Sequence, residues 1–445
     1  MTQSAAQTDQ TTQTDQTAQT VHSTPATQPE QTATFDFTSV IDRHGKDAIA
    51  IDAVGSTDPD LAGFAPHAPK PGFDVIPMWV ADMNFPTAPS IQQAIIERVQ
   101  HPMFGYFRPS AEYYGEIIAW HRDRNGVTGL KPEHIGYENG VLGGVVSALK
   151  AFAEPGDAVL LHSPTYNGFT NTIESNGFRI EHSPLKRDAD GVWRMDFEDM
   201  DRRLKANHIH AAVFCSPHNP TGRVWERWEI ERAMDVYRAN DCVVISDEIW
   251  SDLILAGNRH IPTQSVSDDA RNRTIAFYAP SKTFSLAGLV GSYHIAYNSY
   301  LRDRLTAVSD KTIYNAMNVL SMHALIGAYR PEGRAWLDQL LGVLTGNAEL
   351  AVGFIRSHFP GVDVAMPQGT YMLFLDCTTW CERHGVGIGE LIERGWDAGV
   401  AWEDGRLFQH PCAIRVNLAL PRARVEEALE RMECYVFTDA CESAD

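Results

Sequence analysis

We predict an α/β protein with a mostly parallel central sheet in a large domain, and a smaller α+β domain beside it. Short, continuously apolar runs fill the middle of the chain, which is typical of strands buried on both faces. Stretches with helical periodicity separate these runs, as in alternating β and α units. The predicted strands are residues 158–161, 211–215, 242–246 and 274–278, and the predicted helices are residues 143–153, 166–176 and 227–240.

The later part of the chain predicts the smaller domain. Helical patterns run through residues 322–329 and 336–358, and we read them as one long helical segment. Short strand-like segments follow at residues 369–376 and 413–418, with a helix at 424–435. We therefore divide the chain into a disordered Gln/Thr-rich tail (1–34), an arm that joins the small domain (35–80), a large domain (81–318), a small domain (319–437) and an acidic tail (438–445).

Composition excludes several classes of protein. The chain of 445 residues is 44% hydrophobic, enough for a large core, and its formal net charge is −20. A negative balance argues against nucleic acid and against anionic membrane surfaces as partners. No stretch reaches the roughly 20 apolar residues that span a bilayer, and no secretory signal begins the chain.

The cysteines indicate a reducing compartment. There are seven, an odd number, and no signal precedes them, so we expect reduced thiols and a cytoplasmic protein. Cys377 and Cys381 form the only close pair, and no second Cys/His pair has matching spacing. We therefore predict no metal site.

Polar residues follow the predicted strands directly. Because ligands in open α/β sheets bind outside the carboxyl ends of strands, these residues predict one shared site. The segments are Ser-Pro-Thr-Tyr (163–166), Ser-Pro-His-Asn-Pro (216–220), Asp-Glu (247–248) and Ser-Lys (281–282).

Two ionisable residues carry the chemistry that we predict. Lys282 follows an apolar strand, and desolvation in a cleft would lower its amine pKa and favour imine formation. On position alone, a surface lysine is the commoner interpretation. Asp247 ends another strand, where a buried carboxylate needs a cationic partner such as a protonated pyridine ring. It could equally cap the next turn.

Three further segments offer groups to a flat, phosphorylated ligand. Asn219 could donate a hydrogen bond, although Asn-Pro is also a turn former. Tyr166 could stack on a ring or pack in the core. The Gly-rich helix start that contains Val141 and Leu142 could present backbone N–H groups to a phosphate.

Arg415 interrupts an apolar strand, where an unpaired charge is expensive. Its guanidinium matches an amino-acid carboxylate, and an internal salt bridge is the alternative. A lysine, a carboxylate, phosphate donors and an aromatic surface are the groups that a pyridoxal-5′-phosphate (PLP) site requires.

These motifs, in this order, resemble the class I/II aminotransferase family of fold-type-I PLP-dependent transferases, over about residues 35–437. Within it the chain is most similar to the cystathionine β-lyase (carbon–sulfur lyase) branch, which includes the maltose-regulon modulator. The segments that resemble this branch are Pro-Met-Trp-Val-Ala-Asp-Met-Asn-Phe-Pro (77–86), Phe-Gly-Tyr-Phe (104–107), Ala-Pro-Ser-Lys-Thr-Phe (279–284) and Pro-Gln-Gly-Thr-Tyr (367–371).

The resemblance implies a role for each candidate residue. Lys282 would hold PLP as a Schiff base and move the substrate proton, and Asp247 would pair with the pyridinium. Tyr106 would reach the phosphate of the neighbouring subunit, which implies a homodimer with a shared active site. The other implied cofactor contacts are Val141, Leu142, Tyr166, Asn219, Trp250 and Ser281, and the implied substrate contacts are Arg415, Tyr371 and Trp79.

The departures from the family pattern favour a lyase. Val290 and Ala279 stand where many aminotransferases carry Arg and Ser, and the lyase branch often lacks both. Trp250 stands where relatives carry Tyr or His. The resemblance implies β-elimination from a cysteine S-conjugate such as L-cystathionine, giving a thiol, pyruvate and ammonia. The alternatives are an aminotransferase acting on an amino acid, and a regulatory, partner-binding role beside catalysis.

Overall fold

A computed structural model describes residues 34–58, 65–311 and 315–438. The predicted disordered tail therefore lies outside the described residues except for Thr34, and the acidic tail except for Thr438. Within the described part, no helix combines the length and the apolar character needed to cross a membrane.

The larger sheet has seven strands, and five of them (β9, β8, β7, β3 and β4) run parallel side by side. β10 is antiparallel to both of its neighbours. This confirms the predicted α/β class with a mostly parallel central sheet. In spatial order the strands are β2 (Ile135–Glu138), β10 (Ser292–Ile295), β9 (Thr274–Tyr278), β8 (Val243–Asp247), β7 (Ala211–Cys215), β3 (Ala158–Ser163) and β4 (Arg179–Pro184).

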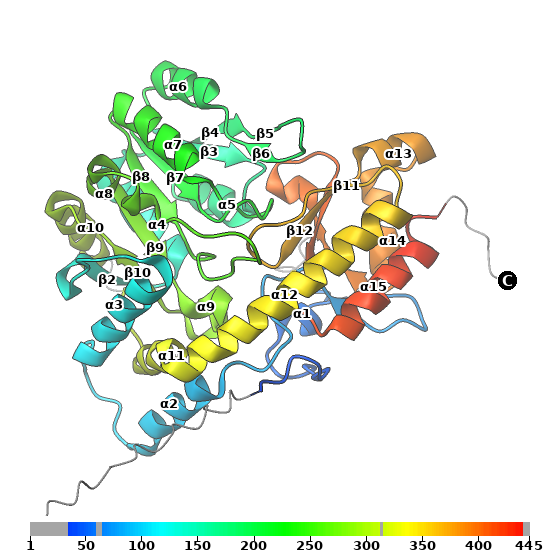
Figure 1. The fold of residues 1–445 in the computed structure, drawn as a ribbon, viewed down its shortest axis with the longest axis horizontal. Helices are drawn as coiled ribbons and strands as arrows, with labels where there is room; N and C mark the ends of the chain where they lie inside the picture. The colour runs from blue at the N-terminus through cyan, green and yellow to red at the C-terminus, as the bar shows by residue number, and fades with distance from the viewer. Residues whose placement is uncertain (1–33, 59–64, 312–314, 439–445) are drawn as a thin grey trace, which may run out of the picture. The chain divides into compact units, whose positions relative to one another are not determined.

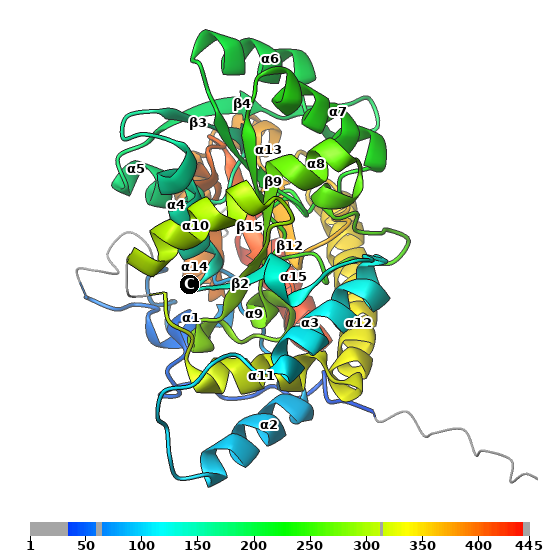
Figure 2. The ribbon, with the colours of Figure 1, turned by 90° about the vertical axis from the view of Figure 1, so that its left-hand side faces the viewer.

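Helices cover both faces of this sheet, which explains the continuous apolar character of its central strands. Figure 2 shows α7 and α8 on one side of the strands and α4, α5 and α10 on the other. A separate hydrophobic core lies on each face. The helices are α4 (Val141–Phe152), α5 (Asn167–Ser175), α6 (Phe197–Ala206), α7 (Arg227–Ala239), α8 (Asp268–Arg273) and α10 (Ser299–Lys311).

A second sheet of four antiparallel strands forms from the later part of the chain, together with α12 and α15. Figure 1 shows α12 running from beside α2 and α11 to the region of this sheet. The strands in order are β11 (Asp363–Val364), β12 (Met372–Asp376), β15 (Ala413–Asn417) and β14 (Glu403–Asp404), and the helices are α11 (Val319–Tyr329), α12 (Pro331–His358), α13 (Thr378–His384), α14 (Ile388–Asp397) and α15 (Arg422–Tyr435).

The single helical segment predicted across residues 322–358 is wrong. The structure divides it into α11 and α12, because Arg330 is extended (φ −62°, ψ 162°) and Pro331 begins the second helix. Proline restricts the residue before it to extended conformations and is well tolerated in the first turn of a helix.

The N-terminal segment packs against the later part of the chain. β1 (Ile76–Pro77) pairs in parallel with β13 (Val400–Ala401). This pairing agrees with an arm that joins the small domain, and the domain boundaries themselves stay a prediction. The remaining elements are α1 (Ile49–Asp52), α2 (Pro89–Gln100), α3 (Ala111–Asn125), the β5 (Lys186–Arg187) and β6 (Trp193–Arg194) hairpin, and α9 (Pro280–Thr283).

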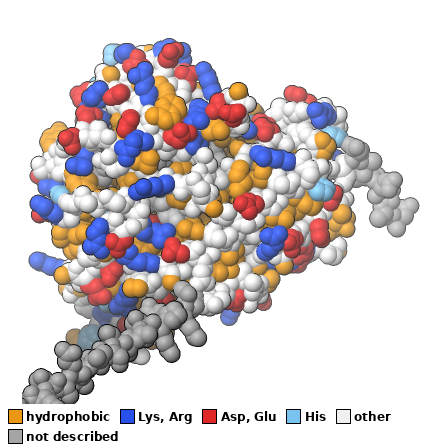
Figure 3. All heavy atoms as spheres, in the orientation of Figure 1, with side chains coloured by type: hydrophobic (Ala, Val, Ile, Leu, Met, Phe, Trp, Pro, Cys, Tyr) orange, Lys and Arg blue, Asp and Glu red, His pale blue; other side chains and the backbone are white. Residues whose placement is uncertain are grey.

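Acidic and basic side chains alternate over the face drawn in Figure 3, without one extended basic area. Such a face offers no continuous track for a phosphate backbone, in keeping with the net charge of −20.

Candidate active site

A cavity of about 280 Å³ opens beyond the carboxyl ends of β7 and β8 and beside the N-terminal ends of α4 and α9. Neighbouring parallel strands deliver their following residues to the same edge, so polar groups far apart in sequence meet there. The predicted residues that line the cavity are Val141, Leu142, Tyr166, Asn219, Asp247, Trp250, Ser281 and Lys282.

Lys282 lies in the short helix α9, which follows β9. Its amine donates a hydrogen bond to the carbonyl oxygen of Ala81 at 2.9 Å. Desolvation and, to a smaller extent, the positive charge of Arg415 lower the pKa of this amine to about 8, against the opposing effect of nearby carboxylates. A lysine with this pKa is neutral in a substantial fraction of molecules near neutral pH, as a nucleophilic amine must be.

Asp247 ends β8, and its Oδ1 accepts a hydrogen bond from the backbone N–H of Ile249 at 3.0 Å. This local contact is the one expected of a residue that caps the next turn. Among the described residues the carboxylate has no ion-pair partner, and burial raises its pKa to about 7. A desolvated carboxylate that faces a cavity without a bonded cation is suited to a cationic ligand atom.

Asn219 and Arg415 are joined directly. Nη1 of Arg415 donates to Oδ1 of Asn219 at 3.1 Å, so the amide NH₂ of Asn219 is the end left to donate to a ligand. Arg415 comes from β15 in the smaller sheet and is only 3% exposed. It also forms an ion pair with Glu403, so the predicted internal salt bridge exists. Arg415 does not itself line the cavity, and it reaches the cavity wall through its hydrogen bond to Asn219.

Tyr166 immediately precedes α5 and forms part of the cavity wall. Its ring meets Phe169 edge-on, with 5.4 Å between ring centroids. A Cβ atom on Gly168 would lie 2.3 Å from Cε1 of this ring, so the absence of a side chain at residue 168 lets the tyrosine occupy its place.

The start of α4 presents free backbone donors. Gly140, at φ +79°, precedes the helix, and no side chain caps it. The N–H groups of Val141 and Leu142 donate to no acceptor among the described residues. Unsatisfied donors and the positive end of the helix dipole together favour an anion such as a phosphate.

Trp250 and Tyr371 pack on each other beside Lys282. Their rings are T-shaped, with 4.8 Å between centroids, and the Lys282 amine lies 5.8 Å from the centroid of the Trp250 ring. The hydroxyl of Tyr371 donates to the carbonyl of Ala81 at 3.0 Å, the oxygen that also accepts from Lys282. Tyr371 therefore lies beside the amine although it is not part of the cavity wall.

Trp79 contributes through its backbone. Its indole donates to the carbonyl of Ala50 at 3.0 Å and is buried away from the cavity. Its own carbonyl accepts from Nη2 of Arg415 at 3.1 Å. The structure therefore places Trp79 next to Arg415, with its side chain turned into the core.

The chain does not bring Tyr106 to the cavity. The residue is fully exposed on the loop between α2 and α3, and it lines a different hollow of about 530 Å³ together with Phe104, Phe107 and Tyr137. A residue placed in this way contributes to a site only if it is the site of another subunit.

Sequence reasoning missed Glu403 and Asn167, which support Arg415. The Oε1 atom of Glu403 lies 3.4 Å from the amide nitrogen of Asn167. An acidic residue that directly follows the apolar segment 400–402 was a usable signal, since such a residue in a strand next to an arginine-bearing strand is expected to pair with it.

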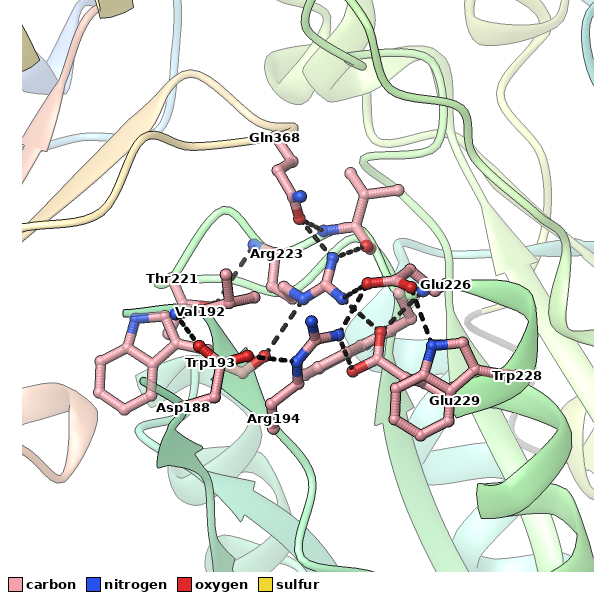
Figure 4. A network of polar contacts seen from close by, with 12 residues as sticks. Asp188, Val192, Trp193, Arg194, Thr221, Arg223, Glu226, Trp228, Glu229 and Gln368 are labelled. Atoms are coloured by element: carbon pink, nitrogen blue, oxygen red, sulfur yellow. Dashed lines mark hydrogen bonds and ion pairs between the residues drawn. The ribbon is translucent and has the colours of Figure 1, made fainter. Parts of the chain in front are cut away.

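A second polar cluster gathers around Arg223, four residues after Asn219 in the sequence (Figure 4). Arg223 is 3% exposed, forms ion pairs with Glu226 and Glu229, and donates to the side chain of Gln368 from the loop before β12. A larger cavity of about 370 Å³ borders this cluster but contains none of the predicted cofactor residues. Through Arg223 and Gln368, the cluster connects the loop that carries Asn219 to the segment before β12 of the smaller sheet.

The fold and its site define a class of enzyme. A mostly parallel seven-stranded sheet covered by helices on both faces is the fold of the fold-type-I PLP-dependent transferases. The family model for aminotransferases of class I and II matches residues 74–432, and the chain belongs to this family.

Individual relatives refine the comparison. The chain is 33% identical over 363 residues to cystathionine beta-lyase PatB of Bacillus subtilis, covering 81% of this chain and 92% of the relative. It is 31% identical to protein MalY of Escherichia coli, covering 89% and 97%. Among solved structures, cystalysin from Treponema denticola, which contains PLP, is 28% identical with a TM-score of 0.81, covering 90% of this chain and 98% of that one.

Proposed function

We propose that this protein is a PLP-dependent carbon–sulfur β-lyase that cleaves L-cystathionine or a related cysteine S-conjugate to a thiol, pyruvate and ammonia. The observation that carries the proposal is the cavity lined by both Lys282 and Asp247, with Arg415 hydrogen-bonded to Asn219 in the cavity wall. The names of the relatives, which include cystathionine beta-lyases and carbon–sulfur lyases, support the choice of reaction.

The residues present fit PLP. Lys282 would hold it through its amine, and the α4 N–H groups of Val141 and Leu142 would hold its phosphate. Asp247 would pair with the ring nitrogen, and this fit rests on a buried carboxylate that forms no close ion pair with any cation of the described chain. Tyr166 and Asn219 would contact the ring, with Trp250 and Ser281 beside it.

When bound, PLP supplies a protonated aromatic ring that accepts the electron pair left at the substrate α-carbon. Arg415 would bind the α-carboxylate and so orient the α-hydrogen toward Lys282. Once the substrate amine has taken its place on the cofactor, the freed Lys282 amine would remove that proton as a general base. The bond between the β-carbon and sulfur would then break, with the sulfur leaving as a thiolate that carries the bonding pair, and water would convert the remaining enamine to pyruvate and ammonia.

Tyr106 supports a homodimeric active unit. Its ring is fully exposed and makes no hydrogen bond within the described part of the chain, and Phe104 and Phe107 on the same loop are exposed as well. We propose that this loop reaches the cavity of a second copy and completes the phosphate site there. We also propose a cytoplasmic location, supported by the six described cysteines, all of which have free thiols.

The test is release of pyruvate and free thiol from L-cystathionine by the PLP-loaded protein. We expect equal amounts of both products, and we expect Lys282→Ala to lower the rate by about 10²–10⁴-fold, the usual contribution of a general base. Absence of pyruvate, with transfer of the amino group to an added oxo acid, would replace the lyase by the alternative, an aminotransferase. A regulatory role beside catalysis would show as partner binding that the Lys282→Ala variant retains.

A further inference from the structure

Glu403 occupies one of the hydrogen-bonding positions that a substrate carboxylate needs on Arg415. Glu403 lies in β14 directly opposite Arg415 in β15, and it is 6% exposed. Its Oε2 forms an ion pair with Nη2 of Arg415. The buried guanidinium at the edge of the candidate active site is therefore already neutralised by a carboxylate of the same chain.

The hydrogens of Arg415 can be assigned one by one. Nη2 carries two, and both have acceptors: the carbonyl of Trp79 at 3.1 Å and the carboxylate of Glu403. Nη1 uses one hydrogen on Asn219 at 3.1 Å, and Nε, although buried, has no partner within the described chain. Free donors therefore remain on Nη1 and Nε.

The free donors alone cannot form a bidentate pair of hydrogen bonds to a carboxylate. The planar guanidinium has two edges that can bind both oxygens of a carboxylate, one formed by Nη1 with Nη2 and the other by Nε with Nη2. Each of these two edges needs a hydrogen of Nη2. The Trp79 acceptor is backbone and fixed, whereas Glu403 is a side chain that can rotate or lose its charge.

We propose that Glu403 is a positioning residue that holds Arg415 in the resting enzyme, and that a substrate α-carboxylate replaces it while Glu403 takes up one proton. This inference rests on the proposed function, because it assigns Arg415 to the substrate carboxylate. It makes Glu403 the residue that sets the affinity for carboxylates and its dependence on pH.

The environment of Glu403 determines whether its pKa is raised or lowered. Arg415 from β15 and Lys282 from α9 stabilise its ionised form, and Asn167 from α5 donates to it, while desolvation acts in the opposite direction and is the largest influence. The net result is a raised pKa for Glu403. The Tyr166 hydroxyl, also near, stays protonated because burial raises its pKa.

A bound carboxylate neutralises Arg415 and so removes the main support for the ionised form of Glu403. The pKa of Glu403 then rises further, and the residue binds a proton at any pH between its free and its bound value. Affinity is therefore highest below this window and falls as pH rises through it, by up to tenfold per pH unit.

The first experiment uses the wild-type, PLP-loaded protein and 3-(methylthio)propionate, a carboxylate with a thioether and no amine. Calorimetry in two buffers of different ionisation enthalpy measures the protons taken up on binding. The cofactor absorbance, recorded in parallel, reports any change in protonation at Lys282. We expect an uptake of up to one proton beyond that change, and an uptake near zero at every pH would overturn the proposal.

The second experiment compares Glu403→Gln with Asp404→Asn. The control removes the same charge from the adjacent residue, whose carboxylate pairs with Arg406 away from Arg415. We expect Glu403→Gln to abolish proton uptake, flatten the pH dependence and bind the probe about tenfold more tightly above the window, since one pKa unit corresponds to tenfold. The control is expected to behave as wild type.

Three outcomes distinguish a failure of this inference from a failure of the proposed function. Weaker binding by Glu403→Gln, with proton uptake unchanged, would show that Glu403 only supports the fold of the site. If the enzyme releases pyruvate and binds the probe without proton uptake, the inference about Glu403 is overturned and the proposed lyase function stands. If the protein neither binds the probe nor releases pyruvate, both the inference about Glu403 and the proposed lyase function are overturned.

Discussion

At the scale of single residues, the candidate site is characterised by ionisable side chains that are buried away from water. Asp247 and Lys282 are both desolvated, and burial moves their pKa values toward each other, to about 7 and about 8. Burial disfavours the charged form of both groups, so each of them can change its protonation state near neutral pH.

Asp247 opposes the stability of the protein without PLP. Its folded pKa of about 7 lies above the ordinary value of 3.8, so the folded chain binds the proton more tightly than the unfolded chain between these values. The free energy of unfolding therefore falls as pH rises through this window. We predict that Asp247→Asn raises the melting temperature of the PLP-free protein at pH 8 and lowers its affinity for PLP.

Thermal scans with and without PLP measure both effects, and Asp235→Asn, an exposed aspartate on α7, is the control. If the Asp247→Asn protein is less stable without PLP and binds PLP as tightly as wild type does, the carboxylate serves only the local turn at Ile249.

At the scale of elements, loops between strands and helices position the site, and buried polar contacts hold those loops. Arg223 follows the loop of Asn219 and meets Glu229, which lies in the first turn of α7 and is fully buried (Figure 4). The same arginine donates to Gln368, so one side chain joins the loop, a helix and the segment that leads to β12.

We predict that Arg223→Met lowers the free energy of unfolding by about 3–5 kcal/mol, because Glu229 then keeps its charge in the core with one arginine, Arg194, instead of two. Urea unfolding measures the change. Arg227→Met removes an arginine from an exposed pair with Glu231 on the same helix, and should change stability by no more than about 0.5 kcal/mol. Equal effects of the two substitutions would contradict the importance of the buried cluster.

At the scale of the whole molecule, the exposed loop between α2 and α3 is the feature that a single chain leaves unexplained. Met103, Phe104 and Tyr106 are 68%, 56% and 112% exposed. Large apolar side chains gathered in this way are typical of a surface that binds another molecule.

We predict that the wild-type protein sediments as a dimer and that Phe104→Glu shifts it toward monomer, because a charge in an apolar interface is desolvated without a partner. Tyr106→Phe should remain dimeric and lose affinity for PLP, since only the hydroxyl is removed. Sedimentation velocity and PLP titration are the measurements. A wild-type protein that is monomeric at all concentrations, with full activity, would contradict the shared site.

Local patterns in the sequence determined the class of fold and the family. The strands at residues 211–215 and 274–278 have the predicted bounds because strands buried on both faces must be apolar throughout. The strands β4 and β10 were not predicted. β4 lies at the sheet edge with mostly partly exposed residues, and β10 carries Ser292 and His294 inside the sheet, so neither shows an apolar run.

The sequence also indicated which residues meet at the cavity, because a lysine or a carboxylate directly after an apolar strand is conspicuous. Only the tertiary structure decided how these residues are paired. Arg415 and Glu403 are close in sequence but meet through the register of β15 and β14, and Arg415 reaches Asn219 across 196 residues. Whether Trp79 offers its indole or its carbonyl was also decided there, because side-chain direction depends on the packing of the whole core.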